Sequence, residues 1–441
     1  MDLNRHSSRA LLWAWQLFDW AAQPFFTLIA TFVFPPFFVT SIVGDAVEGQ
    51  VIWGWTSAAA ALLVGIFAPL VGNYADKTGQ LRKWFILFSG LGMVSASGLW
   101  LCQPGSTYAL PLAILFVLLC TLGFEIATSL NNAMLPKIAE PQQARQLSWT
   151  GWAYGSASGI IILLLFIAFF AVGDNGKTML GITPLISFAD ASSGPARLTG
   201  PLTALWFFIF LLPLLALYRD GKGAHVKKPI TIPTSRPASA LPFLIANTIL
   251  SDALLALFVF GGIYAAAVFG WESARLALLA TALTLSGLFG VLVCIPLDRL
   301  FGTRAIANVC CIVIVAVGVF ILGLDPSRLW FWPAQKIDAL GLSTSELAFA
   351  LASLLIGATS TALQAGLRAM FLPYATTQNA GRLFGFFALS GKSTAFIGPM
   401  LVSIAMAYFD STKAGIALIL VMIGIGALFL RTKPNTTSET A

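Results

Sequence analysis

Long apolar segments alternate with short polar stretches along most of the chain. A transmembrane helix needs about 20 consecutive, mainly apolar residues to cross the hydrocarbon core of a bilayer. Twelve segments reach this length, with approximate bounds 11–40, 51–75, 84–102, 108–134, 148–172, 200–218, 241–269, 274–297, 305–324, 347–371, 383–408 and 413–431. Because a helix satisfies its own backbone polar groups inside a bilayer, the pattern predicts an all-α membrane protein with twelve transmembrane helices.

The amino-acid composition supports the same class. Apolar residues make up 58% of the chain and charged residues 10%, whereas soluble domains average about 45–50% and about 25%. The net charge of +7 does not indicate a nucleic-acid partner. The basic residues fall in loops between the spans, where membrane insertion and anionic lipid headgroups account for them.

No cofactor or metal ion is predicted. The five cysteines show no CxxC or Cys/His spacing and lie in apolar segments or at their ends: Cys102, Cys120, Cys294, Cys310 and Cys311. They are interpreted as small apolar residues rather than metal ligands or disulfides. The sequence also contains no GxxxxGK[ST] phosphate-binding loop, which argues against direct use of ATP.

The distribution of Lys and Arg predicts the orientation, because cytoplasmic loops are enriched in both residues. With the N-terminus inside, seventeen of the 25 Lys and Arg residues fall in inner loops or terminal segments, and six fall in outer loops. Both termini are therefore expected in the cytoplasm. The even number of predicted spans agrees with this orientation.

The chain is expected to fold as two parallel, pseudo-symmetric six-helix bundles. The division is 1–218 for the first bundle, 219–240 for a basic cytoplasmic linker, 241–431 for the second bundle and 432–441 for a disordered tail. Three pairs recur between the halves at similar offsets: Asp19 and Asp252, Asp76 and Asp298, Pro136 and Pro373. In transporters built this way, the solute site lies at the interface of the halves near the middle of the membrane.

A charged loop with several glycines recurs between the halves. The first copy runs from Gly72 to Lys83, and a weaker copy runs from Cys294 to Arg304. Glycine permits tight turns and close approach of backbones. The alternative to a gating role is an ordinary basic loop that only determines the membrane topology. The candidate gating residues are Gly72, Asp76, Lys77, Gly79, Arg82, Asp298 and Arg299.

Five ionisable residues fall in or at the end of predicted spans: Asp19, Glu125, Asp252, Arg368 and Lys392. Such groups are costly in a bilayer, so each is a candidate for function. At helical spacing, Gln23, Thr27 and Thr31 follow Asp19, Ser129 and Asn132 follow Glu125, and Thr361 and Gln364 precede Arg368. The candidate substrate- and proton-binding set is Asp19, Gln23, Glu125, Asn132, Asp252, Gln364, Arg368 and Lys392.

Structural alternatives exist for these charged residues. Asp19 would pair with Lys392, and Glu125 with Arg368, only to hold helices together. Arg368 would otherwise extend to the inner membrane surface.

Several motifs resemble a known family. The twelve spans, the central linker and the Gly72–Lys83 loop resemble the major facilitator superfamily. Six motifs resemble the branch of this superfamily that is related to fungal vacuolar amino-acid effluxers. They are Phe18-Asp-Trp-Ala-Ala-Gln23, Thr31-Phe-Val-Phe-Pro-Pro-Phe-Phe38, Asn131-Asn-Ala-Met-Leu-Pro136, Gly151-Trp-Ala-Tyr-Gly155, Gln364-Ala-Gly-Leu-Arg368 and Phe384-Gly-Phe-Phe-Ala-Leu-Ser-Gly-Lys392. The chain departs from this branch in Ala-Ala-Gln after Trp20, in Ala253, and in one extra residue between Asp298 and Gly302.

The resemblance implies a rocker-switch transporter that works as a monomer, with helices 1, 4, 7 and 10 lining the cavity. The Gly72–Lys83 loop would then act as a latch. Asp76 would lie at a helix N-terminus, where the helix dipole favours a carboxylate, and the basic residues would face the neighbouring half. The chain lacks the large insertions of the fungal members, so the expected location is the cytoplasmic (inner) membrane of a bacterium.

Three functional classes follow. A secondary transporter of a small polar solute, with an amino acid as the candidate, fits three carboxylates and two cations, because a zwitterion needs a partner for each charge. A carboxylate in the membrane would carry the coupled proton. An exporter of hydrophobic or cationic compounds, or of lipid, is the alternative on the same fold. The third class is a membrane enzyme or a non-transporting receptor. An enzyme is not predicted, because both histidines, His6 and His225, lie outside the spans and no catalytic set converges.

Overall fold

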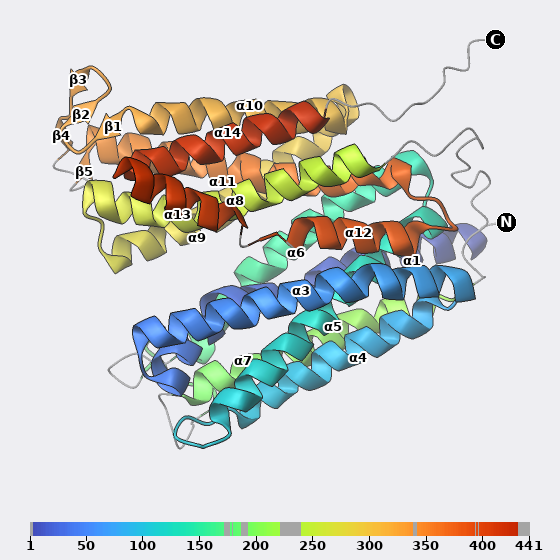
Figure 1. Cartoon of the computed structure of the whole chain (residues 1–441). Helices are drawn as coiled ribbons and strands as arrows, with labels where there is room; N and C mark the ends of the chain where they lie inside the picture. Colours follow the sequence, from blue (N-terminus) through green and yellow to red (C-terminus); the bar gives the residue numbers. More distant parts are fainter. Residues whose placement is uncertain are drawn as a thin grey trace, which may run out of the picture. The chain divides into compact units, whose positions relative to one another are not determined.

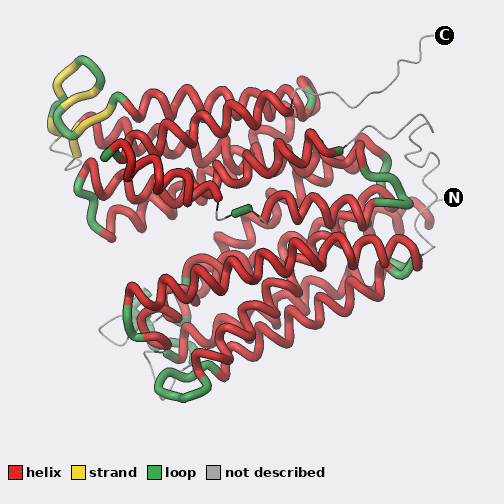
Figure 2. The backbone as a smooth tube through the Cα atoms, viewed as in Figure 1, coloured by secondary structure: helices red, strands yellow, loops and turns green. Residues whose placement is uncertain are grey.

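The computed structural model is almost entirely helical (Figures 1 and 2). It describes residues 3–171, 177–178, 180–186, 193–220, 240–337, 342–392, 394–395 and 397–430. Within these residues, twelve stretches are long and apolar enough to cross a membrane: Arg9–Val43, Ala46–Thr78, Leu81–Leu101, Ala109–Ile138, Pro141–Phe169, Gly194–Leu217, Leu241–Phe269, Leu278–Phe301, Thr303–Leu322, Thr344–Tyr374, Ala380–Phe409 and Thr412–Leu430. The predicted number of spans is confirmed.

By its contacts the chain divides into two units. The first comprises Met1–Thr231 and Ala375–Leu389, and the second comprises Ile232–Tyr374 and Ser390–Ala441. The first unit thus contains one segment, Ala375–Leu389, that the sequence assigns to the second bundle. The predicted linker lies outside the described residues apart from Arg219, Asp220 and Ala240, and the predicted tail lies wholly outside them.

Six long helices build most of the first unit: α1 (Leu3–Pro24), α3 (Ala46–Thr78), α4 (Leu81–Gly98), α5 (Ala109–Ile138), α6 (Pro141–Phe169) and α7 (Gly194–Leu217), with the 3-10 turn η3 (Leu99–Leu101) after α4. Aromatic rings fill its core. Phe124 stacks on Phe25 with ring centroids 4.8 Å apart, and it meets Phe207 edge-on at 4.8 Å. In lipid, such packing rather than exclusion of water holds helices together.

The first span is not one regular helix, so the prediction of a single helix over 11–40 was wrong in this detail. Proline lacks the N–H that an α-helix uses, and α1 ends at Pro24. The π-helix η1 (Phe25–Phe32), the short α2 (Phe34–Phe37) and the π-helix η2 (Phe38–Val43) follow. π-helical turns are rare and occur often at functional sites.

The second unit contains α8 (Leu241–Phe269), α9 (Ser273–Phe301), α10 (Thr303–Leu322), α11 (Thr344–Phe371), the 3-10 turn η4 (Leu372–Tyr374), α13 (Ile397–Phe409) and α14 (Thr412–Leu430). Helix α11 packs against α9 and α10, and α14 packs against α8. Glycine allows the closest of these approaches. A side chain at Gly290 of α9 would overlap the backbone of Ala358 in α11.

The eleventh span is also divided, contrary to the single helix predicted over 383–408. Helix α12 (Ala380–Lys392) ends four residues before α13 begins. Of residues 393–396, the structure describes Thr394 and Ala395. The amide of Ala395 donates to the carbonyl of Lys392, and the amide of Ile397 donates to the carbonyl of Thr394. These residues therefore form turns between the two helical pieces.

Short strands in the loop after α10 modify the predicted all-α class. They are β1 (Leu324–Asp325), β2 (Arg328–Leu329), β3 (Trp332–Pro333), β4 (Lys336–Ile337) and β5 (Leu342–Ser343), and each has two residues. β1, β2 and β3 pair in order as antiparallel neighbours, and β4 pairs with β5 (Figure 2). Strands of two residues leave no alternating pattern from which the sequence could predict them.

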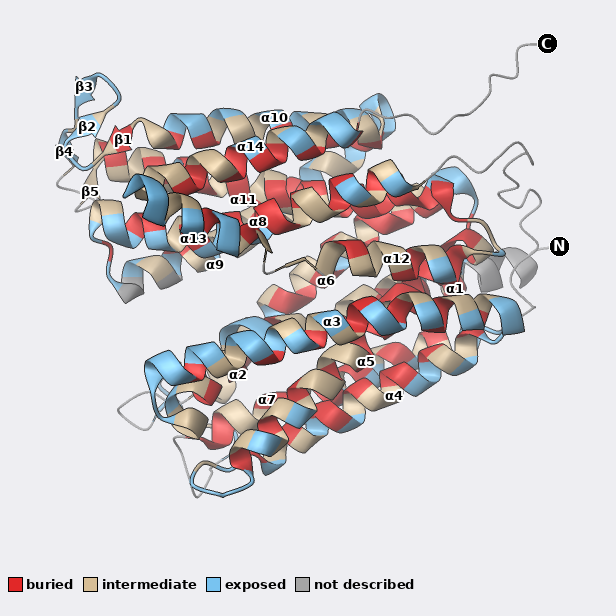
Figure 3. Cartoon of the chain, in the orientation of Figure 1, coloured by how far each residue is buried: buried red, intermediate tan, exposed pale blue. Residues whose placement is uncertain are grey.

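Many positions in the spans are exposed (Figure 3), and many of these positions hold large apolar side chains. Leu70, Leu164, Phe289 and Ile312 are each between 57% and 66% exposed and lie in helices that qualify as spans. In water such side chains would mark interaction surfaces or aggregation hazards. In this protein they suit contact with lipid acyl chains.

Candidate functional site

The carboxylate of Asp76 lies at the start of α12 in the first unit. Its Oδ1 accepts a hydrogen bond from the amide of Gly381 at 3.1 Å, and its Oδ2 accepts one from the amide of Arg382 at 2.8 Å. The first amides of a helix have no partner within the helix, and the helix dipole favours an anion there. Lys137 Nζ lies 3.7 Å from Asp76 Oδ1 and adds a positive charge to the same group.

Glycines bring the two helices close enough for this contact. A side chain at Gly72 would overlap the backbone of Gly381, and one at Gly385 would lie 2.5 Å from the carbonyl oxygen of Ala68. Gly79 ends α3 with a φ of 67°, a conformation that glycine adopts without strain. The close approach of α12 therefore requires glycine at position 72, and the left-handed backbone at the end of α3 favours glycine at position 79.

Arg82 makes contacts that the resemblance did not suggest. Its amide donates to both carboxylate oxygens of Asp220 at 3.1 Å, and its guanidinium donates to the carbonyl of Leu215 at 2.8 Å. These partners lie at the end of α7 in the same half, not in the neighbouring half. Burial, together with the adjacent Asp220, raises the pKa of Tyr218, so the phenol stays protonated. The Lys77 side chain is exposed.

The second copy of the loop contains Asp298 at the end of α9. Its carboxylate is buried and accepts a hydrogen bond from the hydroxyl of Thr303, the first residue of α10. Arg299 is exposed. Asp298 therefore connects two successive helices, whereas Asp76 contacts a helix more than 300 residues away in the sequence.

In the first unit, Asp19 and Gln23 of α1 face α6. A side chain at Gly155 would lie 3.3 Å from the carbonyl oxygen of Asp19, and one at Gly159 would lie 2.7 Å from Thr27 Oγ1. Small residues four apart let membrane helices approach closely. Asp19 and Gln23 are both half-buried.

The predicted polar face of the first span does not extend to Thr31. This residue lies in η1, is exposed, and its hydroxyl donates to the carbonyl of Phe26, five residues earlier. A π-helix has a longer hydrogen-bond step than an α-helix. It therefore rotates Thr31 away from the face that regular spacing would give it.

Helix α5 carries the other predicted polar residues of the first unit. Glu125 is 9% exposed and Asn132 is 6% exposed. Asn131 is a residue that sequence reasoning missed as a candidate. Within the described part of the chain, neither side-chain polar atom of the fully buried Asn131, nor Oδ1 of Asn132, has a hydrogen-bond partner. Buried amides with unused hydrogen-bonding capacity are uncommon and point to a polar ligand or water.

In the second unit, Asp252 of α8 lies beside the division of the eleventh span. Its side chain is 3% exposed, and its Oδ1 accepts a hydrogen bond from the hydroxyl of Thr394 at 3.1 Å. A side chain at Gly398 would lie 2.6 Å from the carbonyl oxygen of Asp252. The start of α13 is therefore held against the residue that the sequence singled out.

Two further polar residues near Asp252 were not predicted. Asn247 is buried five residues before it on α8, and its amide nitrogen donates to Ser390 Oγ at 2.9 Å. Thr394 was missed as well, since no helical spacing links it to an ionisable group. Its position depends on the turn between α12 and α13. Lys392, the last residue of α12, is half-buried.

Gln364 and Arg368 lie one turn apart on α11. Arg368 is 4% exposed and Gln364 is half-buried. A buried guanidinium does not fit the alternative in which Arg368 extends to the membrane surface. Thr361, one turn earlier, packs against α9, where a side chain at Gly287 would lie 2.5 Å from its hydroxyl.

Comparison with known proteins gives concordant matches. The family model described as "Vacuole effluxer Atg22 like" matches residues 39–436. The MFS-type transporter YxiO of Bacillus subtilis (strain 168) is 21% identical over 440 residues, which cover 96% of this chain and 95% of the relative.

Solved structures show the same fold. The proton:xylose symporter XylE, bound to 6-bromo-6-deoxy-D-glucose, superposes with a TM-score of 0.69 at 13% identity, covering 97% of this chain and 95% of that one. A bacterial homologue of the iron transporter ferroportin in its outward-facing state gives a TM-score of 0.66 at 14% identity, covering 96% and 98%. At such low identity the likeness concerns the fold alone, which is that of the major facilitator superfamily.

Proposed function

Because the chain belongs to the vacuole effluxer Atg22-like family of the major facilitator superfamily, we propose that it moves a small zwitterionic solute, of which an amino acid is the candidate, coupled to protons. As a member of a transporter family, it is not an enzyme. The observation that carries the proposal is the buried carboxylate of Asp252 beside a divided span. Irregular backbone at membrane depth is typical of transporter binding sites.

The mixture of charges favours a zwitterion. Glu125, Asp252 and Arg368 are at most 9% exposed within spans, and Asp19 and Lys392 are half-buried. Charged side chains at such positions are costly and mark solute or ion pathways. We assign solute contacts to both signs of charge, with the carboxylates binding an ammonium group and the cations a carboxylate. Gln23, Asn132 and Gln364 supply polar contacts on the same helices.

The burial of Asp252 supports the proposal of proton coupling. Thr394 supplies one hydrogen bond to this carboxylate, which is modest compensation for a charge at 3% exposure. Binding a proton removes that cost. A solute ammonium does the same by ion pairing, so a proton and a solute would compete for Asp252.

Asp76 is proposed as a latch. It accepts hydrogen bonds from the first amides of α12, and glycines hold α3 and α12 close together at this contact. Lys77, Arg299 and Asp298 have no assigned part in the latch beyond their place in the loops. We further propose that both termini face the cytoplasm of a bacterium and that the transporter works as a monomer in its cytoplasmic membrane.

Counterflow in proteoliposomes tests the solute class. Vesicles preloaded with one neutral amino acid at a time are diluted into labelled amino acid. Each amino acid is compared with its N-acetyl derivative and its carboxamide, which remove one charge each. We expect accelerated exchange with the zwitterion and little with either derivative.

The main alternative predicts a different pattern. If the protein exports hydrophobic or cationic compounds, the carboxamides and amphiphilic cations will exchange or inhibit, and the zwitterions will not. That pattern would replace the amino acid with a cation as the cargo. It would leave the family and the fold unchanged.

A further inference from the structure

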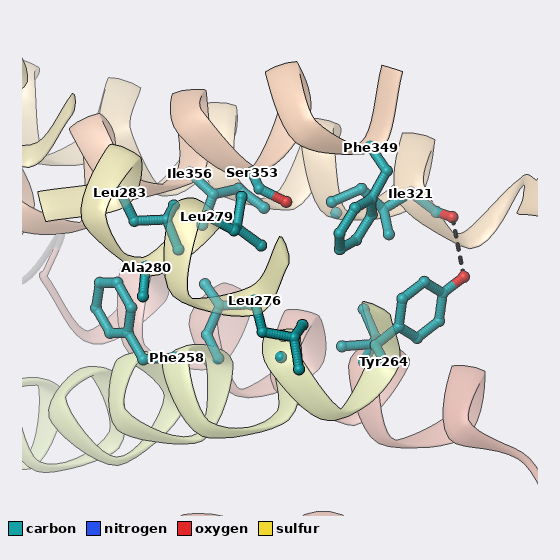
Figure 4. Close-up of a pocket in the computed structure, with 15 residues that line it drawn as sticks. Phe258, Tyr264, Leu276, Leu279, Ala280, Leu283, Ile321, Phe349, Ser353 and Ile356 are labelled. Carbon is teal, nitrogen blue, oxygen red and sulfur yellow. Dashed lines mark hydrogen bonds between the residues drawn. The ribbon is translucent and has the colours of Figure 1, made fainter. Parts of the chain in front are cut away.

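An apolar cavity of about 110 Å³ lies in the second unit, among α8, α9, α10, α11 and α14 (Figure 4). It lies beyond the proposed solute residues along α8: Leu257, the lining residue of α8 nearest to Asp252, is five residues from it, or about 7.5 Å at the rise of an α-helix. Tyr264 and Ser353 are the polar side chains of its lining. A charged solute would find no ionic partner in it.

Two adjacent glycines in α8, Gly261 and Gly262, line this cavity without a packing reason. A Cβ at either position would meet no atom of the described residues within 4 Å. Glycine destabilises the middle of a helix relative to alanine, so a pair of glycines normally answers a steric need. Gly318, which also lines the cavity, shows such a need, because a side chain there would overlap Leu420. The space beside Gly261 and Gly262 is left open instead.

Tyr264 and Ile321 lie at one end of the group of lining residues (Figure 4). There the hydroxyl of Tyr264 donates to the carbonyls of Ile321 at 3.3 Å and Leu324 at 3.5 Å. This uses the donor of the phenol, and the ring of Tyr264 stacks with Phe349 at 5.8 Å. What remains facing the cavity is mainly carbon.

The wall is continuous with surface that suits contact with lipid. Phe258 lines the cavity and is 42% exposed, and Leu278, beside the lining residue Leu279, is 71% exposed. Both α8 and most of α9 qualify as membrane spans. The apolar molecule in contact with such a surface is the bilayer lipid.

We propose that this cavity binds one acyl chain of a bilayer phospholipid, which lies against Gly261 and Gly262 between α8 and α9. The chain fills space that no side chain of the described residues occupies, and it supports α8 beyond Asp252. An apolar cavity of similar size in a soluble protein stays dry and takes up small hydrophobic molecules. The inference concerns a bound lipid, not the cargo, and it holds whether or not the solute is an amino acid.

Photolabelling tests this site directly. Wild-type protein is reconstituted with a phosphatidylethanolamine that carries a diazirine in its acyl chain, illuminated and digested, and the labelled peptides are identified by mass spectrometry. We expect label concentrated in residues 257–283. In Gly261→Leu, labelling of this segment should fall at least about fivefold, because the leucine side chain would occupy the apolar space beside α8 that the acyl chain would otherwise enter.

Gly424→Leu is the matched control. Gly424 lies in the middle of α14 in the same unit, and a Cβ there also meets nothing within 4 Å. It does not line the cavity, so its labelling should equal that of wild type. Equal labelling in Gly261→Leu and Gly424→Leu would overturn the proposal.

A second experiment needs no variant and identifies the lipid source. Unlabelled phosphatidylethanolamine should dilute the label in proportion to its mole fraction, while free oleate at the same mole fraction should not displace it selectively. Selective loss of label from residues 257–283 with oleate would contradict a phospholipid chain. Label spread evenly over all spans would contradict a specific site.

Discussion

The two aspartates that recur between the halves, Asp19 and Asp252, have similar neighbours but different irregularities. In the first half, Asp19 lies on α1, five residues before Pro24 and the π-helix η1, and the facing helix α6 is uninterrupted. In the second half, Asp252 lies on the uninterrupted α8, and the facing span is divided into α12 and α13. The irregular backbone is in the aspartate's own span in one half and in the opposite span in the other.

What the halves share is a glycine against the aspartate. Gly155 of α6 packs at the backbone of Asp19, and Gly398 of α13 packs at the backbone of Asp252. The fifth and eleventh spans correspond in the internal repeat, so the repeat preserves which spans meet. It does not preserve where a helix is interrupted. The position of the interruption is therefore free to differ between the two halves.

The largest expected effect is that of Gly398→Ala. The added Cβ would lie 2.6 Å from the carbonyl oxygen of Asp252 and 3.0 Å from its carbonyl carbon. Backbone atoms cannot rotate away, so α13 must shift, and overpacking of this kind costs about 1–3 kcal/mol. We expect a lower melting temperature in detergent and a loss of transport of at least about tenfold, since a site displaced by 1 Å loses much of its activity.

Gly391→Ala is the control for this change. Its Cβ would lie 3.6 Å from Asn247 Nδ2 and from Ser251 Oγ, which is ordinary contact. The variant should melt and transport like wild type. Equal damage from both variants would show that any alanine in this span is harmful, and the specific contact with Asp252 would lose its support.

Thr394→Val should have an intermediate effect. The substitution keeps the shape but removes the hydroxyl that donates to Asp252 at 3.1 Å. An unsatisfied buried group costs about 1–3 kcal/mol. The lower part of this range, about 1–2 kcal/mol, corresponds to about fivefold to thirtyfold in an equilibrium. We expect proton-driven uptake to fall by about this factor. Thr394→Ser should restore most of it, and a valine variant that transports normally would remove Thr394 from the site.

Gly155→Ala tests the same contact in the first half and should have the smallest effect. Its Cβ would lie 3.3 Å from the carbonyl oxygen of Asp19 and 3.4 Å from the flexible Gln23 side chain. The neighbours need to yield by only a few tenths of an ångström, and alanine favours the helix by about 0.5–1 kcal/mol. The melting temperature should change little. If Gly155→Ala lowered the melting temperature as much as Gly398→Ala, the glycine contacts at Asp19 and Asp252 would be equally tight. That result would contradict the difference between the two halves described above.

The fold could be predicted largely from sequence because lipid imposes one strong rule. Apolar runs such as 241–269 define spans by length alone, and the structure gives the same helix. The interruptions could not be located this way. Pro24 signals the end of α1, but nothing around Thr394 distinguishes a turn from a helix in an apolar segment.

The candidate site was predictable only one residue at a time. Asp252 and Arg368 stand out as buried charges in apolar runs, and both are buried in the structure. Thr394 and Asn131 could not be found, because hydroxyl and amide side chains are ordinary in membrane helices. Thr394 reaches Asp252 only because a turn places it there. Asn131 stands out only because it is buried and its side-chain polar atoms have no hydrogen-bond partner among the described residues.

Solute-evoked proton flux tests the central claim most directly. Proteoliposomes containing a pH-sensitive dye receive one neutral amino acid, with wild type, Asp252→Asn and Asp410→Asn measured side by side. Asp410 is the matched control, because it is exposed and its positive φ of 49° suits asparagine. We predict a proton flux in wild type and Asp410→Asn and none in Asp252→Asn. Uptake of the amino acid without proton flux in wild type, or an unchanged flux in Asp252→Asn, would contradict the assignment of Asp252 as the proton carrier.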